Sequence, residues 1–141
     1  YVVEFNVRFG DPECQVTLPL ISSDVYELLF SSATGNLNSY DAKFSEMHCL
    51  TVVLASEGYP GPPAKGRTIS GEGLTASGIS WVNHAGTGFV EGNLISTGGR
   101  VLSATGMGED LSVAAQRAYS VIEEIDLLGS HFRRDIGHRA L

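Results

Sequence analysis

The stretch YVVEFNVRFGDPECQ, residues 1–15, decides the fold of the N-terminal part of the chain. Along residues 1–9 every second side chain is apolar, and because neighbouring side chains of a strand point to opposite faces, this alternation predicts a half-buried strand. The apolar face consists of Tyr1, Val3, Phe5, Val7 and Phe9. Gly10 permits a sharp exit, and Asp11 followed by Pro12 is typical of a helix start, so we expect a short helix to about Leu20.

A second helix and then a change of composition follow. Asp24 precedes apolar residues at helical spacing and Gly35 supplies a stop, so a helix is predicted between them. From Thr51 onward, β-branched residues, glycine and proline become frequent. We therefore expect a domain boundary near residues 42–46, with one domain over residues 1–45 and a second over residues 46–141.

The second domain is predicted to be mostly β-structure. Short apolar runs separated by glycine-rich turns are typical of antiparallel strands. These runs cover residues 67–70, 79–84, 88–90, 93–96 and 100–105. Behind Asp110, apolar residues recur at helical spacing to about Ile125, which predicts one helix covering a face of the sheet. The expected fold class is α+β, and residues 58–66, rich in proline and glycine, are expected to form a semi-rigid loop.

Composition argues against several classes of protein. The chain has 141 residues, of which 43% are hydrophobic, and a formal net charge of −7. Its apolar runs are far shorter than the roughly 20 residues of a membrane span, and it lacks a basic patch, so we expect neither a membrane nor a nucleic acid as partner. Two isolated cysteines, Cys14 and Cys49, favour a reducing compartment and a cytoplasmic protein. Because the chain begins at Tyr1 inside an apolar run, we also expect it to be a piece of a longer protein.

The polar face of the first predicted strand is the first candidate for chemistry. Glu4, Asn6 and Arg8 are uncommon residue types in strands and share one face of it. Carboxylate and amide oxygens suit Mg²⁺, which usually completes its shell with water and substrate phosphates, and an arginine beside them suits the same phosphates. A polar strand face that is merely solvated explains the alternation as well, and the pattern alone favours that interpretation.

Two further positions are candidates for substrate binding. Asp11 either caps the helix that follows or receives an ammonium group, and the cap is the simpler interpretation. Lys65, followed by Gly66 at the end of the proline-rich loop, is equally well explained as a solvated charge or as a cation held over a substrate. The histidines and cysteines lack the spacing of a zinc site.

The motifs together resemble a known family. Residues 3–15 (VEFNVRFGDPECQ) are similar to the last strand and helix start of the ATP-grasp domain of the phosphoribosylamine–glycine ligases, also called glycinamide ribonucleotide synthetases. The resemblance continues in order through most of the chain. It includes residues 51–60 (TVVLASEGYP), 65–66, 84–87, 98–105 and 133–141 (RRDIGHRAL). It implies the C-terminal end of an ATP-grasp domain, followed by a small β-rich domain of barrel or sandwich-hybrid type.

The resemblance also implies a reaction and a set of site residues. The family joins glycine to 5-phosphoribosylamine with ATP in purine biosynthesis, by way of an acyl phosphate. Glu4 and Asn6 match ligands of Mg²⁺ (or Mn²⁺), and Arg8 matches a catalytic residue that faces the transferred phosphate and the substrate. Asp11, Lys65 and Gly66 match substrate-side positions, although Pro63 and Ala64 replace the usual tyrosine and glutamate before the lysine.

The same resemblance implies that this chain acts with other parts of its enzyme. It lacks the N-terminal domain and the ATP-grasp lid of the family, so we expect these residues alone to be inactive. Two rival functions are a biotinyl- or lipoyl-like module that carries a modified Lys65, and another ATP-grasp ligase of purine synthesis. The run from Arg8 to Glu13 favours the glycine ligase over the latter.

Overall fold

The computed structural model describes residues 1–3, 5, 7–75 and 77–140. Its centre is strand β6 (Arg100–Gly108), which pairs antiparallel with β1 (His48–Ala55) on one side and with β3 (Ser80–His84) on the other. In this register Thr105 faces both Thr51 and Trp81. The Thr105 side chain is fully buried, and its hydroxyl oxygen lies 2.8 Å from that of Thr51 and 3.1 Å from the Asn83 side-chain oxygen. A polar chain of three residues therefore links all three strands.

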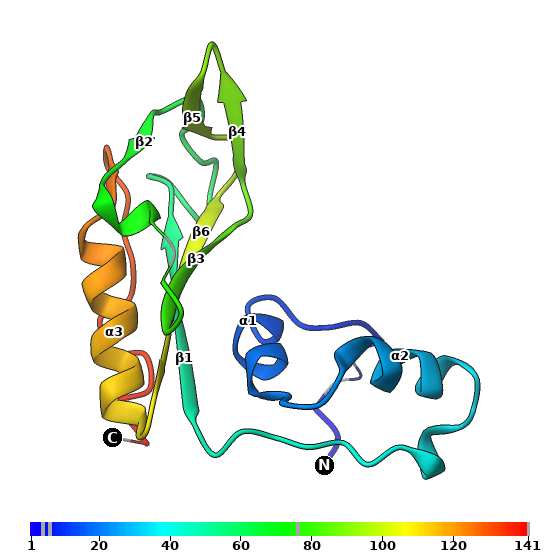
Figure 1. The fold of residues 1–141 in the computed structure, drawn as a ribbon. Coiled ribbons are helices and arrows are strands. Elements are labelled where there is room, and N and C mark those ends of the chain that lie inside the picture. Colours follow the sequence, from blue (N-terminus) through cyan, green and yellow to red (C-terminus); the bar gives the residue numbers. More distant parts are fainter. Residues whose placement is uncertain (4, 6, 76, 141) are drawn as a thin grey trace.

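Helix α3 (Leu111–Glu123) covers one face of this sheet (Figure 1). Asp110 caps it, because its carboxylate accepts a hydrogen bond of 2.8 Å from the Val113 N–H. Five of its residues are buried against the sheet: Ala114, Ala115, Ala118, Val121 and Ile122. The small residues of the helix face Gly106 of β6, where a side chain would collide with the helix backbone. The predicted helix, its cap and its position on the sheet are thus confirmed.

Smaller β-elements extend this body. Strands β4 (Thr87–Val90) and β5 (Asn93–Ser96) form a hairpin that projects from the end of the sheet (Figure 1). Strand β2 (Ile69–Ser70) pairs with β7 (Asp126–Leu127) beyond the end of α3, and the 3-10 helix η3 (Glu72–Leu74) follows β2. The strand predictions are confirmed with small shifts of their ends, whereas β7 was not predicted because two residues carry no periodic pattern.

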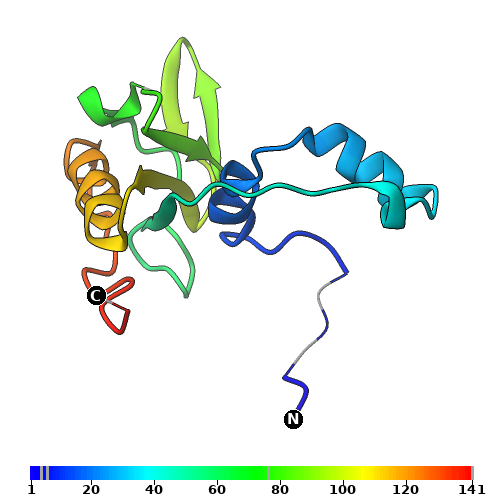
Figure 2. The ribbon, with the colours of Figure 1, turned by 60° about the horizontal axis from the view of Figure 1, so that its bottom comes forward.

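The N-terminal third consists of short helices. Helix α1 (Cys14–Thr17) continues into η1 (Leu18–Leu20), and α2 (Val25–Ala33) is followed by η2 (Leu37–Ser39). Both views place α1 on the side of β1 opposite to α3, while α2 lies farther out (Figures 1 and 2). Helix α2 has its predicted cap, with the Asp24 carboxylate accepting from the Glu27 N–H at 3.0 Å, but it buries none of its residues. The structure is a mixed α/β arrangement, as predicted.

The strand predicted over residues 1–9 is wrong for the residues that the structure describes there. Residues 1–3, 5 and 7–9 have no strand assignment, and Val3, Phe5 and Val7 are 95%, 86% and 98% exposed. Figure 2 shows the N-terminal segment leading away from the rest of the chain. A strand needs a neighbouring strand for its backbone hydrogen bonds, and among the described residues none pairs with this segment. The alternation correctly marks one face of residues 1–9 as apolar, but no described part of the chain packs against Val3, Phe5 or Val7.

Candidate functional site

The predicted metal and phosphate residues lie in the N-terminal segment, at positions 4, 6 and 8. Glu4 and Asn6 lie outside the described residues. Arg8 is exposed, and its guanidinium donates a hydrogen bond of 3.0 Å to the neighbouring Phe9 carbonyl oxygen. Among the residues that the structure describes, no three histidine, cysteine or acidic side chains gather as a metal site would require. Within the described part of the chain, Arg8 is thus an exposed cation whose contact is this one bond to the backbone.

Asp11 is the best-defined of the predicted site residues. One carboxylate oxygen, Oδ2, lies 3.0 Å from Arg100 Nη2, and the other, Oδ1, accepts from Gln15 Nε2 at 3.1 Å. Arg100 Nη1 also donates to the backbone carbonyl oxygen of Asp11 at 3.0 Å. Asp11 is thus held by an arginine that lies 89 positions away in the sequence.

The cap interpretation of Asp11 is wrong. Helix α1 begins at Cys14, and its N-cap residue is Glu13, which makes no side-chain capping bond. The first turn is instead closed by the backbone, with the Cys14 N–H donating to the Gly10 carbonyl oxygen at 2.8 Å. The described partners of the Asp11 carboxylate are the Arg100 guanidinium and the Gln15 side-chain amide, not a backbone N–H of the helix.

The loop that carries Lys65 is anchored by its backbone. The Ala64 N–H donates to the Glu57 carbonyl oxygen at 2.9 Å, and the Gly66 N–H donates to the Ser96 carbonyl oxygen at 2.7 Å. Gly66 has a φ of +78°, a conformation that residues with a side chain rarely adopt. Lys65 is exposed, and within the described residues its ammonium group has no hydrogen-bond or ion-pair partner. The loop is therefore fixed while its cation is available to a ligand.

One short segment, Ser96 to Arg100, holds both predicted substrate residues in place. Its first residue binds the Lys65 loop through Gly66, and its last residue, Arg100, binds Asp11. Between them, the Ser56 N–H donates to the Gly99 carbonyl oxygen at 2.8 Å, and the Ser56 hydroxyl donates to the Gly98 carbonyl oxygen at 2.9 Å. We call residues 96–100 the anchoring segment.

A cavity of about 370 Å³ lies beside these residues. Pro12, next to Asp11, forms one wall, and Tyr59 of the proline-rich loop forms another. The remaining lining residues are Thr51, Val52, Val53, Arg133 and Ile136. The helix start and the Lys65 loop therefore border a common cavity, and Arg133 is the charged residue among its described lining.

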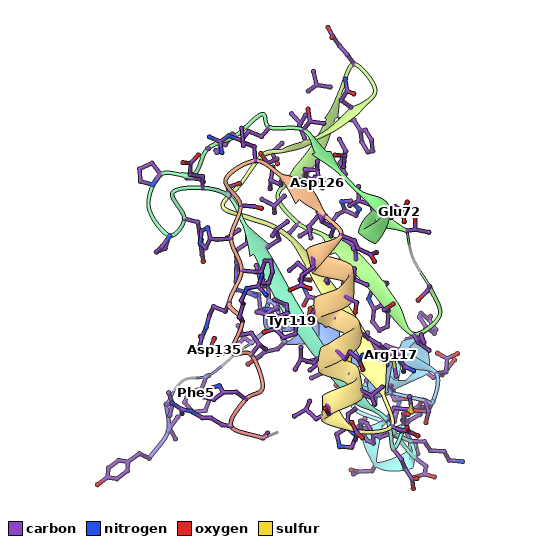
Figure 3. All side chains as sticks on the ribbon, turned by 90° about the vertical axis from the view of Figure 1, so that its left-hand side faces the viewer. Phe5, Glu72, Arg117, Tyr119, Asp126 and Asp135 are labelled. Carbon is purple, nitrogen blue, oxygen red and sulfur yellow. The ribbon has the colours of Figure 1, made fainter. Side chains whose placement is uncertain are left out.

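Arg133 is itself in a well-defined pair. Its guanidinium donates two hydrogen bonds, of 2.9 and 2.8 Å, to the Asp135 carboxylate, and these bonds raise the pKa of Arg133 and lower the pKa of Asp135. Tyr119 of α3 fixes this turn, because its hydroxyl donates to the Arg133 carbonyl oxygen at 2.9 Å and accepts from the Ile136 N–H at 3.1 Å. Figure 3 shows Tyr119 on the helix and Asp135 on the neighbouring C-terminal segment.

The sequence does not predict the contact between Arg100 and Asp11. Arg100 is expected only as the first residue of a strand, because no local pattern links it to a partner 89 positions away. The single signal was its place in residues 98–105, one of the stretches that resemble the ligase family. No helix of the described part of the chain has the length and apolarity that a membrane span requires.

Comparison with known proteins identifies the family. Residues 49–139 match the family described as phosphoribosylglycinamide synthetase, C domain. The chain is 46% identical to a chloroplastic phosphoribosylamine–glycine ligase of Arabidopsis thaliana and 48% identical to a phosphoribosylamine–glycine ligase of Mycobacterium leprae, in each case over 99% of its length. It covers 27% and 32% of these relatives, so it spans at most about a third of their length.

A solved structure agrees with this result. The crystal structure of a phosphoribosylamine–glycine ligase from Thermotoga maritima matches 96% of the chain with a TM-score of 0.75 and 32% sequence identity, and the chain covers 33% of it. A trifunctional purine biosynthetic protein of Gallus gallus is 45% identical over 99% of the chain, which covers 14% of that protein. The chain therefore belongs to the phosphoribosylamine–glycine ligase family and matches its C-terminal part.

Proposed function

We propose that the chain is the C-terminal part of an enzyme that joins 5-phosphoribosylamine to glycine at the expense of ATP. The match to these ligases over 99% of the chain carries the proposal. In this reaction a glycine carboxylate oxygen attacks the γ-phosphorus of ATP and releases ADP. The amine of phosphoribosylamine then attacks the carbonyl carbon of the glycyl phosphate, and phosphate leaves as the amide bond forms. We expect this chemistry in the cytoplasm.

The proposed metal and phosphate residues lie in residues 4–8. Glu4 and Asn6 supply hard oxygen donors, which are the ligands that Mg²⁺ or Mn²⁺ prefers. The metal ion, when bound, neutralises phosphate charge. Arg8 is the proposed catalytic residue, and its exposed guanidinium supplies a permanent planar cation for the equatorial oxygens of the transferred phosphoryl group. Phosphoryl transfer needs positioning and charge neutralisation more than a protein nucleophile, and these residues provide both.

Asp11 and the loop of Lys65 and Gly66 are the proposed substrate-binding elements. A carboxylate has about four acceptor positions, and Arg100 and Gln15 fill two of those of Asp11, so positions remain for the ammonium group of glycine. The ammonium of Lys65, which is exposed and has no partner among the described residues, suits the negative charge of a carboxylate or phosphate on a bound substrate. Pro12, which follows Asp11, and Tyr59, of the same loop as Lys65, both line the cavity, which is the proposed space for a substrate.

The chain alone is proposed to be inactive. The exposed apolar side chains of Val3, Phe5 and Val7 find no packing partner among the described residues, and they are proposed to pack against another part of the ligase. We propose residues 1–45 as the end of an ATP-grasp domain and residues 46–141 as the C-terminal domain. A biotinyl-like carrier is not favoured, because Lys65 lies in an anchored loop rather than at the β4–β5 hairpin tip, which Glu91 and Gly92 form.

The test is the glycine- and phosphoribosylamine-dependent release of ADP by the full-length protein that contains this chain. Replacing Arg8 by alanine removes transition-state stabilisation, so we expect kcat to fall by roughly 100- to 1000-fold with a smaller change in KM. Arg134→Gln is the matched control, because Arg134 forms an exposed pair with Glu123 at 2.7 Å outside the proposed site. A full-length protein without this activity, or an Arg8→Ala variant with the wild-type kcat, contradicts the proposal.

A further inference from the structure

The guanidinium of Arg100, in β6, binds both the carboxylate and the backbone carbonyl oxygen of Asp11. We infer that Arg100 is a positioning residue of the ligase, which holds the Asp11 carboxylate in the orientation that receives the ammonium group of glycine. This inference rests on the proposed function and adds a residue to it. It predicts that the C-terminal domain controls the affinity for glycine through one side chain.

The contact has the geometry of a two-point clamp. Arg100 Nη2 lies 3.0 Å from a carboxylate oxygen of Asp11, and Arg100 Nη1 donates to the Asp11 carbonyl oxygen at 3.0 Å. Binding the side chain and the backbone of one residue together fixes the direction of the carboxylate as well as its distance. A lysine offers a point charge and does not reproduce such a fork.

Arg100 is itself held by the core of the domain. It opens strand β6, where it faces Ala55 of β1, and its carbonyl oxygen accepts from the Gly86 N–H at 3.0 Å. The two residues that follow, Val101 and Leu102, are 0% and 1% exposed. The side chain thus projects from a rigid base, whereas Asp11 lies in a turn before a four-residue helix. The rigid partner of this pair is Arg100, and the positioned partner is Asp11.

The anchoring segment also limits the distance between the two proposed substrate elements. Gly66 is bonded to Ser96, and Asp11 is bonded to Arg100, only four residues later. Four residues span at most about 14 Å even when fully extended. The Asp11 carboxylate and the loop that presents Lys65 are therefore attached to one short segment, Asp11 through the Arg100 side chain and the loop through the Gly66 N–H. Without the guanidinium, the described contacts of the Asp11 carboxylate reduce to the single bond from Gln15.

The experiment measures steady-state kinetics of the full-length enzyme with each substrate varied in turn. Arg100→Gln is expected to raise the KM for glycine about tenfold, since the pair is charge-assisted but about two-fifths exposed, and to leave kcat and the KM for ATP within about twofold. Arg100→Lys is expected to recover part of the affinity. The control Arg134→Gln removes an exposed ion pair elsewhere and is expected to match the wild type.

A double-mutant cycle separates positioning from a structural role. Asp11→Asn removes the carboxylate charge without altering strand β6, and adding Arg100→Gln to it is expected to raise the KM for glycine by less than twofold further. Equal effects of Arg100→Gln in the presence and absence of the Asp11 carboxylate overturn the inference. So does an Arg100→Gln enzyme that resembles Arg134→Gln, or one in which kcat and every KM change together. If Arg100→Gln does not fold, an unchanged KM for glycine in Asp11→Asn overturns it. Failure of the proposed function is a different result, because the wild-type enzyme is then inactive.

Discussion

The contact between Gly106 of β6 and helix α3 provides a quantitative prediction. A Cβ added at Gly106 would lie 2.5 Å from the Ala114 carbonyl oxygen and 2.6 Å from the Ala118 nitrogen. Both are backbone atoms of the helix, so no side-chain rotation relieves the overlap. Ordinary contacts begin near 3.4 Å, so the helix must retreat by about 0.9 Å at this point. A gap of this size along the five buried residues of α3 forfeits a quarter to a half of each dispersion contact that it opens.

We therefore expect Gly106→Ala to lower the free energy of unfolding by about 3 kcal/mol, at the upper end of the usual cost of overpacking. For a chain of this length the melting temperature falls by roughly 10 °C. Urea unfolding of the 141-residue chain measures the change. Gly78→Ala is the matched control, because no described heavy atom lies within 4 Å of its added Cβ and its backbone needs no positive φ, so it should be neutral or slightly stabilising. Equal midpoints for the two variants would refute the close approach of α3 to β6.

Two further predictions concern the cap of α3 and the Cys49 thiol. Asp110→Ala removes the bond to the Val113 N–H and is expected to lower the free energy of unfolding in urea by about 1 kcal/mol. Asp24→Ala should leave the global unfolding midpoint unchanged, because α2 buries none of its residues, and equal losses for both caps would contradict this. Burial raises the pKa of Cys49 to about 11, against an ordinary 9.0, so at pH 8 a smaller fraction of this thiol is ionised to the reactive thiolate. In a Cys14→Ser variant, alkylation of Cys49 by iodoacetamide at pH 8 should therefore be roughly 100-fold slower than that of a small free thiol with the ordinary pKa. The folded state holds this proton more tightly than the unfolded state, so the Cys49 thiol should lower the free energy of unfolding as the pH rises from about 9 to about 11. A free energy of unfolding that is constant over that range would contradict the burial of the thiol.

Local patterns predicted the elements that the core of the domain supports. Helix α3 shows both a cap residue and apolar residues at helical spacing, and the structure buries those residues against β1 and β6. The predicted strand over residues 100–105 was correct for the same reason, since Val101, Leu102 and Ala104 enter the core. Where burial and periodicity agree, the sequence alone identifies the element.

The features that the sequence did not predict depend on distant partners. The Asp11 carboxylate was expected to cap a helix, but a guanidinium far along the chain binds it instead. Residues 1–9 alternate as a strand does, yet alternation contains no information about whether a neighbouring strand is present. The proposed roles of Glu4, Asn6 and Arg8 rest on the resemblance to the ligases, since the pattern alone favours a solvated strand face.

The most direct test of the proposed function follows the oxygen atoms of glycine. The full-length protein is incubated with ATP, 5-phosphoribosylamine and glycine labelled with ¹⁸O in its carboxylate, and the phosphate is analysed by mass spectrometry. A glycyl phosphate intermediate requires one labelled oxygen to pass from glycine to each phosphate released, and glycinamide ribonucleotide to form in equal amount. Unlabelled phosphate, or ADP release that does not depend on glycine, would contradict the proposed function.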